Sequence, residues 1–359
     1  MSLQARLDAF KADFEAGEPP YRKEKEVQRA AIVGLGWWGQ QILRQLRGSD
    51  VIRITQAVGH RKAHRSIADE HGVGFSTEFE QVLADRSIDL IILATPHALH
   101  SAQIAAAARA RKHVFCEKPI GLTVEEVRGS LDACRAAGVR LGVGHERRFE
   151  PAIDELRQLV KQGSFGTIMH VEGSFSHDKL RSLPSDNWRI VAANEPPLAM
   201  TATGIHLTDL FIDLVGPVES VAAFPANRVA FANSADVLSL QLRFTCGATG
   251  YINTILATPF YARLIIYGSE GWAEVRNATH PDQEGPSTLI FQPRTGTTRT
   301  STLEWKSAVR TNLEQFALSI EGRADYPFTN EQIVSNVAVL AAVTQSVATG
   351  QTVAIPEMD

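Results

Sequence analysis

The amino-acid sequence predicts an α/β N-terminal domain with a doubly wound parallel sheet, followed by an α+β C-terminal domain with an open, mostly antiparallel sheet. Short apolar runs alternate with helical stretches between residues 30 and 145, a pattern typical of parallel strands joined by crossover helices. After Pro151, long β-rich runs replace this alternation. The chain has 359 residues, which is enough for two domains. We therefore expect domains over residues 29–150 and 151–359.

An N-terminal extension, residues 1–28, precedes the first expected strand. Its apolar residues Leu3, Leu7, Phe10 and Phe14 are spaced like one stripe of an amphipathic helix, and Gly17 ends the pattern. We expect a helix that packs on the first domain or on a neighbouring subunit.

A glycine-rich turn follows the first expected strand, Ala30–Val33. The turn reads Gly34-x-Gly36-x-x-Gly39, and helix-forming residues come directly after it. The first glycine allows a tight turn, the second lets the backbone approach a pyrophosphate, and the third lets helix and strand pack closely. The helix N-terminus then offers N–H groups to the anion. We expect a Rossmann-type dinucleotide-binding domain; the alternative is a tight turn that binds nothing.

The rest of the first domain repeats this order of strand and helix. Further strands are expected at residues 51–58, 90–94, 113–116 and 139–143. Two intervening helices are expected to begin with capping boxes, Thr77-x-x-Glu80 and Thr123-x-x-Glu126.

The second domain begins with one more helix, residues 152–161, and then becomes β-rich. Strands are expected at residues 168–175, 218–224, 237–244, 248–256 and 264–267. Hairpin turns are expected at 246–247 and 268–271, and a final helix at 330–348.

The composition argues against several classes of function. The net charge is −4 and no basic stretch is long, so we expect no nucleic-acid partner. The three cysteines, Cys116, Cys134 and Cys246, are scattered outside any disulfide or metal-site spacing. No apolar run approaches the ~20 residues of a membrane helix. We expect a cytoplasmic protein with no bound metal and no membrane contact.

Lys118 directly follows an apolar strand that ends at Cys116. Ligands of parallel α/β sheets bind at the carboxyl ends of the strands, so this lysine is expected beside the nucleotide. A desolvated ammonium there can exchange a proton with a substrate hydroxyl. The alternative is a solvated lysine paired with Glu117.

Five segments in this order resemble the glucose–fructose oxidoreductase / inositol dehydrogenase family (Gfo/Idh/MocA). They read GLGWWG, ATPHALH, HVFCEKP, GVGHERRFEP and GIHLTDL, and the similarity runs from residue 29 to the C-terminus. The tripeptide EKP is the most specific of these features.

The resemblance implies roles for individual residues. Lys118 would be the catalytic lysine and His206 the catalytic histidine, which exchanges the hydroxyl proton while a hydride moves to or from nicotinamide. The implied cofactor-binding residues, in addition to the glycines, are Trp38, Thr95, Pro96, His100 and Glu117.

One departure from the family pattern concerns the histidine. The family usually carries an aspartate four residues before it, and this chain has Ala202 there. Asp209, at i+3 from His206 on the expected helix, is a possible substitute. Its alternative role is that of a buried capping or helix-start acid.

A second departure concerns the end of the second strand, where an acid usually accepts the ribose 2′-OH of NAD. Here His60 stands at that place, followed by Arg61. Cations suit a 2′-phosphate, so we expect NADP rather than NAD. The alternative is a solvated basic loop that tolerates NAD.

Three further polar residues, His145, Arg148 and Thr203, are placed at the substrate pocket, although salt bridging is an equal alternative for the arginine. The expected function is NAD(P)-dependent oxidation or reduction of a sugar, a polyol or a related derivative. The alternatives are a catalytically silent nucleotide-binding sensor, prompted by Ala202, and an NAD-assisted glycosidase. The resemblance also implies a homodimer or homotetramer paired through the C-terminal sheet.

Overall fold

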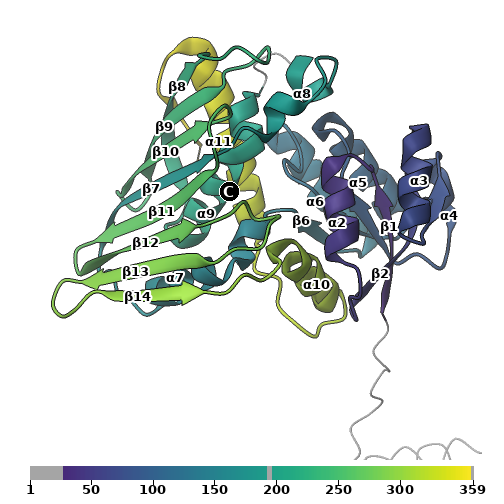
Figure 1. Cartoon of the computed structure of the whole chain (residues 1–359), viewed down its shortest axis with the longest axis horizontal. Coiled ribbons are helices and arrows are strands. Elements are labelled where there is room, and N and C mark those ends of the chain that lie inside the picture. The colour runs from purple at the N-terminus through teal and green to yellow at the C-terminus, as the bar shows by residue number, and fades with distance from the viewer. Residues whose placement is uncertain (1–26, 192–195, 357–359) are drawn as a thin grey trace, which may run out of the picture.

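The computed structural model of the chain describes residues 27–191 and 196–356, which form two sheets with helices packed on them (Figure 1). The amphipathic helix expected in residues 1–28 lies outside the described residues except for the last two. Both sheets and their types agree with the fold class that the sequence predicts.

The first sheet has six strands in the order β3-β2-β1-β4-β5-β6, all parallel. Its central strands are apolar and buried on both faces, as expected for a sheet covered by helices on both sides. The strands are β1 (Gln28–Val33), β2 (Ile52–Val58), β3 (Gly74–Ser76), β4 (Leu90–Leu93), β5 (His113–Cys116) and β6 (Leu141–Val143). The sequence did not predict β3, whose three residues are too few to show a pattern.

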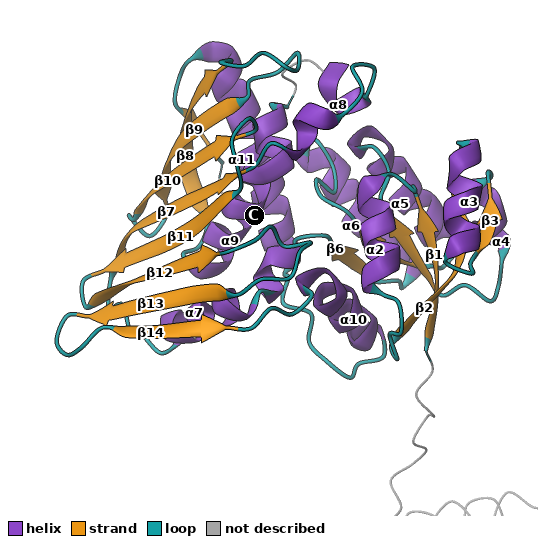
Figure 2. Cartoon of the chain, viewed as in Figure 1, coloured by secondary structure: helices purple, strands orange, loops and turns teal. Residues whose placement is uncertain are grey.

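Helices cover both faces of this sheet (Figure 2). One face packs against α2 (Trp37–Gln45), α3 (Lys62–Glu70) and α10 (Ala308–Ile320). The other packs against α4 (Phe79–Ala84), α5 (His100–Arg109), α6 (Val124–Ala137) and the beginning of α11 (Asn330–Thr349). Thus two helices from the C-terminal part of the chain complete the core of the first sheet.

The two predicted capping boxes have different outcomes. The Thr123 hydroxyl accepts a hydrogen bond from the backbone N–H of Glu126, and the Glu126 carboxylate accepts one from the backbone N–H of Thr123, so this box is confirmed. The Thr77 box is wrong, because α4 begins two residues later and the Thr77 hydroxyl donates to the side chain of Glu78.

The second sheet has nine strands in the order β14-β13-β12-β11-β7-β10-β9-β8-β15. Only the β7–β10 pair is parallel, so the sheet is mostly antiparallel. The strands are β7 (Ile168–Ser176), β8 (Val218–Ala226), β9 (Val237–Phe244), β10 (Thr249–Ile255), β11 (Tyr261–Gly268), β12 (Gly271–Asn277), β13 (Ser287–Pro293), β14 (Arg299–Leu303) and β15 (Val353–Ala354). The last four were not predicted; the turns expected at 246–247 and 268–271 join β9 to β10 and β11 to β12.

Helices α7 (Pro151–Lys161), α9 (Ile205–Leu214) and α11 pack on the face of this sheet that is turned toward the first domain (Figure 1). The opposite face is open and exposes Met169 and Tyr251. By length and composition α11 is apolar enough to span a membrane, but 61% of that window is buried against the rest of the protein, as in a core helix. The layers place the carboxyl ends of the parallel strands opposite the inner face of the second sheet.

Candidate active site

The glycine-rich turn has the geometry of an anion-binding loop. Gly34 has φ +99°, and a Cβ there would lie 2.5 Å from the carbonyl oxygen of Ala94. A Cβ on Gly39 would lie 2.0 Å from the carbonyl oxygen of Gly34, so strand and helix pack as closely as expected. Gly36, the N-cap of α2, has no atom within 4 Å of its would-be Cβ. This open space at a helix N-terminus fits a dinucleotide pyrophosphate.

The end of β2 carries exposed polar side chains, among them the guanidinium of Arg61. His60 and Arg61 follow Val58 and Gly59 directly, and Arg61 is the N-cap of α3. No acid stands at this strand end, where a ribose 2′-hydroxyl would otherwise find its acceptor.

The loops after β4 and β5 are tied together by His100. Its Nδ1 lies 2.7 Å from the carbonyl oxygen of Pro119 and its Nε2 lies 3.0 Å from that of Thr95. The ring is fully buried, with both nitrogens engaged. The expectation that His100 contacts the nucleotide is therefore corrected: this residue holds the loops on which Thr95 and Pro96 are presented.

Glu117 follows β5 directly, at the carboxyl end of the parallel sheet, and is buried. Its carboxylate leaves no room for a Cβ on Gly144, which would lie 2.4 Å from Oε2. Burial raises the pKa of Glu117 to about 7, while the Trp38 indole and the Lys118 ammonium act to lower it. Glu117 can therefore change its charge near neutral pH.

Lys118 reaches from the end of β5 to the second domain. Its Nζ donates hydrogen bonds to the carbonyl oxygens of Thr201, at 3.0 Å, and Ala202, at 2.8 Å. Both belong to the π-helical segment η4 (Met200–Gly204), whose irregular turn leaves these carbonyls available. Burial lowers the pKa of Lys118 to about 8, opposed by Glu146 and Glu117. A lysine with this pKa can give and take a proton near neutral pH.

His206 is the second residue of the regular helix α9, which follows η4 directly, and it is buried. Its ring packs edge-on against His145, with centroids 5.8 Å apart, and against Phe175, at 5.9 Å. Burial, with the nearby charge of Lys118, holds the pKa of His206 well below its ordinary value. His206 is thus kept neutral and able to accept a proton.

Glu146 is a site residue that was not predicted from the sequence. It follows β6 in the short helix η2 (Glu146–Phe149), and its Oε2 lies 3.7 Å from Nδ1 of His206. Burial, reinforced by the Glu117 carboxylate, raises the pKa of Glu146 to about 8, and Lys118 opposes the shift. An acid directly after a parallel strand is the signal that could have identified it.

Comparisons with known proteins agree with this geometry. Residues 28–145 match an oxidoreductase family with an NAD-binding Rossmann fold, and residues 153–274 match the GFO/IDH/MocA C-terminal domain. The chain belongs to the Gfo/Idh/MocA oxidoreductase family. It is therefore an oxidoreductase with an NAD-binding Rossmann domain.

Three proteins illustrate its relations within the family. A 1,5-anhydro-D-fructose reductase of Ensifer adhaerens is 28% identical over 308 residues, covering 85% of this chain and 90% of the relative. A D-xylose 1-dehydrogenase (NADP(+)) of Haloarcula marismortui is 26% identical, covering 70% and 73%. The structure of a levoglucosan dehydrogenase in complex with NADH and levoglucosan matches with a TM-score of 0.79 at 19% identity, covering 92% and 100%.

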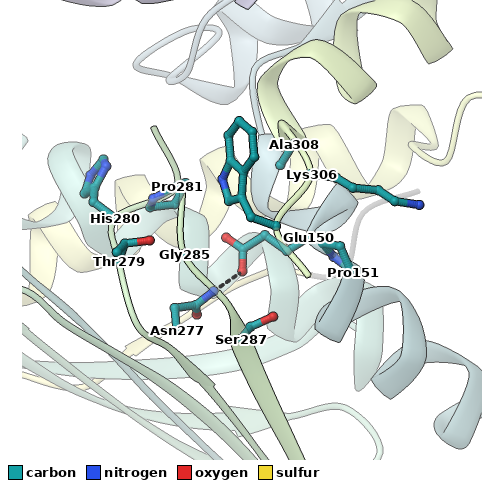
Figure 3. A pocket seen from close by; sticks show the side chains of 11 residues that line it. Glu150, Pro151, Asn277, Thr279, His280, Pro281, Gly285, Ser287, Lys306 and Ala308 are labelled. Atoms are coloured by element: carbon teal, nitrogen blue, oxygen red, sulfur yellow. Dashed lines mark hydrogen bonds between the residues drawn. The ribbon is translucent and has the colours of Figure 1, made fainter. Parts of the chain in front are cut away.

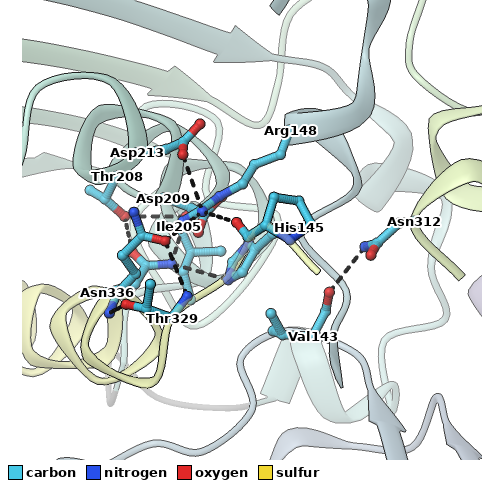
Figure 4. A network of polar contacts seen from close by, with 12 residues as sticks. Val143, His145, Arg148, Ile205, Thr208, Asp209, Asp213, Asn312, Thr329 and Asn336 are labelled. Carbon is cyan, nitrogen blue, oxygen red and sulfur yellow. Dashed lines mark hydrogen bonds and ion pairs between the residues drawn. The ribbon is translucent and has the colours of Figure 1, made fainter. Parts of the chain in front are cut away.

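The substitute expected for the missing family aspartate is corrected by the structure. Asp209 accepts two hydrogen bonds of 2.8 Å from Arg148, and both side chains are buried (Figure 4). Arg148 also contacts Asp213 and Gln332. The pair therefore joins α9 to η2 and α11 as a structural ion pair, and neither residue is left to bind a substrate.

Thr203 and His145 were also expected to line the substrate pocket, and the structure gives them different surroundings. Thr203 is fully buried and donates its hydroxyl to the carbonyl oxygen of Ala199 within the helix, so it does not line the pocket as expected. His145 packs on His206, and its Nε2 accepts a hydrogen bond from Nδ2 of Asn336, 3.1 Å away (Figure 4). His145 thus packs against His206 and is itself held by α11.

Side chains of the second domain form the wall of the site that faces His206. We use this name for Phe175, His177, Lys179, His280 and Asp282. Phe175 at the end of β7 contacts His280 in the β12–β13 loop, with centroids 5.5 Å apart, and His177 lies 5.3 Å from His280. Lys179 donates to Asp282 at 2.6 Å and lies 5.1 Å from the Trp37 ring of the glycine-rich turn. The wall extends from His206 to Trp37 of the glycine-rich turn. His280 and Asp282 were not predicted as site residues, because no pattern in the sequence marks them.

Proposed function

We propose that this enzyme is an NADP-dependent dehydrogenase or reductase that acts on a secondary alcohol or carbonyl of a sugar or polyol. The observation that carries the proposal is the meeting of Lys118 and η4, the segment before His206, where the carboxyl ends of the parallel strands face the second domain. The loop at Gly36 that fits a pyrophosphate opens at the same ends.

Lys118 and His206 have different roles in the proton transfer. When bound, the nicotinamide supplies the hydride acceptor or donor. His206, neutral through burial, takes the hydroxyl proton as the alcohol is oxidised, and Lys118 stabilises the negative charge that develops on the oxygen. In the reverse direction the same groups return the proton.

The proposed substrate class rests on the wall and on the relatives. Phe175 offers an apolar face, and His177 and His280 offer ring nitrogens, a combination that suits the C–H and O–H faces of a carbohydrate. The named relatives are a reductase of an anhydro sugar and a dehydrogenase of xylose.

The preference for NADP is supported by His60 and Arg61 in place of an acid. One relative is named as NADP-dependent and one structural neighbour binds NADH, so the family uses both cofactors. Michaelis constants for the two cofactors test the preference; a lower constant for NAD would contradict it.

The first experiment is to identify the nucleotide released from denatured protein by absorbance and mass, and then to screen sugars and polyols for turnover with it. Released NADP and a change at 340 nm would support the proposal. Bound nucleotide without turnover would favour a sensor, and hydrolysis of a glycoside without net reduction of cofactor would favour an NAD-assisted glycosidase.

We also propose that the open face of the nine-stranded sheet pairs two copies of the chain. Exposed Met169, Tyr251 and Phe224 support this, since large apolar side chains on one open sheet face favour association. Light scattering would show a dimer or tetramer; a monomer at micromolar concentration would contradict the proposal.

A further inference from the structure

Two buried polar atoms without hydrogen-bond partners face each other inside the site. They are Nδ1 of His206 and Oε2 of Glu146, which lie 3.7 Å apart among the described residues. Buried polar atoms are almost always paired, so two unpaired atoms at this separation need a joint explanation. A small rotation of either side chain would bring them into hydrogen-bond contact.

The short helix that carries Glu146 is fixed from both sides. On one side Arg147 donates to Glu150, at 2.8 Å, and to Asn277 of β12, at 3.0 Å; Figure 3 shows the Glu150–Asn277 bond that completes this contact. On the other side Arg148 is bound by Asp209 of α9. These contacts tie η2 to both the sheet and the helix of His206, so Glu146 is held in place opposite the imidazole.

We propose that Glu146 is the positioning residue of His206, supplying from the first domain the carboxyl group that Ala202 lacks on the helix of the second domain. The inference rests on the proposed function. Accepting a hydrogen bond from Nδ1–H fixes the tautomer whose Nε2 lone pair is free for the substrate. When the hydroxyl proton passes to Nε2, the imidazolium still donates from Nδ1 to Glu146; in the reverse reaction the proton returns to the substrate oxygen.

Burial and the charges around the pair decide the protonation state of its two members. Glu117 and Lys118 at the end of β5, His145, Arg147 and Glu150 around η2, and His280 of the β12–β13 loop all act on one or both members. The cations among them disfavour protonation of His206, and the raised pKa of Glu146, about 8, keeps Glu146 protonated in the pH range where His206 takes up its own proton. Near neutral pH the contact is therefore a hydrogen bond between two neutral groups, and its removal should change the tautomer of His206 rather than its titration.

The test is the nitrogen NMR spectrum of ring-labelled histidine near neutral pH in the full-length protein with NADP bound, because the ring-nitrogen shifts report the tautomer and no substrate is needed. The His206 signals are assigned by their loss in His206→Asn. We expect the wild-type ring to carry its proton on Nδ1, Glu146→Leu to move the proton toward Nε2, and Glu125→Leu, at an exposed glutamate on α6, to leave the wild-type tautomer unchanged. The same tautomer in wild type and Glu146→Leu would overturn the proposal.

A second variant tests the replacement of one carboxyl group by another. Adding Ala202→Asp to Glu146→Leu should return the His206 proton toward Nδ1, because residues at i and i+4 share a helix face. A double variant with the tautomer of Glu146→Leu would overturn this part. Should Glu146→Leu fail to fold, Glu146→Met, which keeps the length of the side chain without an acceptor oxygen, provides the same measurement.

Kinetics separate this inference from the proposed function. With a sugar that the wild type turns over, Glu146→Leu should lower kcat about 10- to 100-fold and leave both Michaelis constants within about threefold. A wild type without turnover on any sugar would count against the proposed function, while the tautomer of His206 would still decide the role of Glu146.

Discussion

Lys118 of the first domain donates a 2.8 Å hydrogen bond to the backbone carbonyl of Ala202 in the second. The carbonyl belongs to the irregular turn that precedes His206, so Lys118 bridges the two domains beside that histidine. The position of the Lys118 ammonium therefore depends on how the two domains meet.

Replacing Lys118 by methionine should lower kcat by at least 100-fold, because it removes the cation while keeping the length of the side chain. The dissociation constant of NADP, followed by tryptophan fluorescence, should change by less than about threefold, since the lysine is expected to act on the substrate oxygen. Lys161→Met, at the exposed end of α7, is the matched control. An active Lys118→Met enzyme would refute the role.

Replacing His60 by aspartate should reverse the cofactor preference. An acid at the end of β2 accepts the 2′-hydroxyl of NAD and repels the 2′-phosphate of NADP, so the Michaelis constant for NADP should rise at least tenfold and that for NAD should fall. Arg86→Asp, an exposed position before β4 and so at the opposite, amino end of the parallel strands, should change neither. Unchanged constants would mean that the basic loop does not contact the ribose.

The buried Asp209–Arg148 pair should stabilise the fold far more than the exposed Asp132–Arg135 pair does. Asp209→Asn leaves a buried guanidinium without one of its carboxylates, and breaking such a pair costs about 3–5 kcal/mol of unfolding free energy. Asp132→Asn, which breaks an exposed pair with Arg135, should cost less than about 1 kcal/mol. Denaturant unfolding measures both; equal losses would contradict the structural role.

The parts of the fold with a strong periodic pattern were predictable. The parallel sheet, the turn at Gly34 and the helix after Thr329 all follow from short-range patterns, and so did the place of Lys118 at a strand end. Strand β3 and strands β12 to β15 were missed because they are short or carry alternations broken by polar residues.

The site was less predictable than the fold, because its partners come from distant parts of the chain. Asp209 and Glu146 are both acids near the site in sequence terms, and only the structure shows that the first is bound by Arg148 and the second faces His206. Likewise His100 looks like a nucleotide contact until both its ring nitrogens are found on backbone carbonyls. The spacing of residues along the chain shows which of them share a helix face. It does not show which residues from distant segments pack against that face.

The buried histidines should make the protein sensitive to acid. Burial lowers the pKa of His145 to about 4, against about 6.5 in an unfolded chain. The unfolded state therefore binds this proton first, and stability present above pH 6.5 is lost as the pH falls toward 4. The raised pKa values of Glu117 and Glu146 act with the opposite sign, since their contribution is lost as the pH rises.

The contribution of one histidine can be isolated by comparing slopes. Between pH 6.5 and 4 the unfolding free energy of His145→Asn should fall less than that of the wild type, by at most about 3 kcal/mol, whatever the baseline stability of the variant. Urea unfolding at several pH values measures this difference. Parallel curves for the two proteins would show that His145 takes up its proton in the folded state as readily as in the unfolded one, and that the packing of its ring against His206 and Asn336 does not keep it neutral.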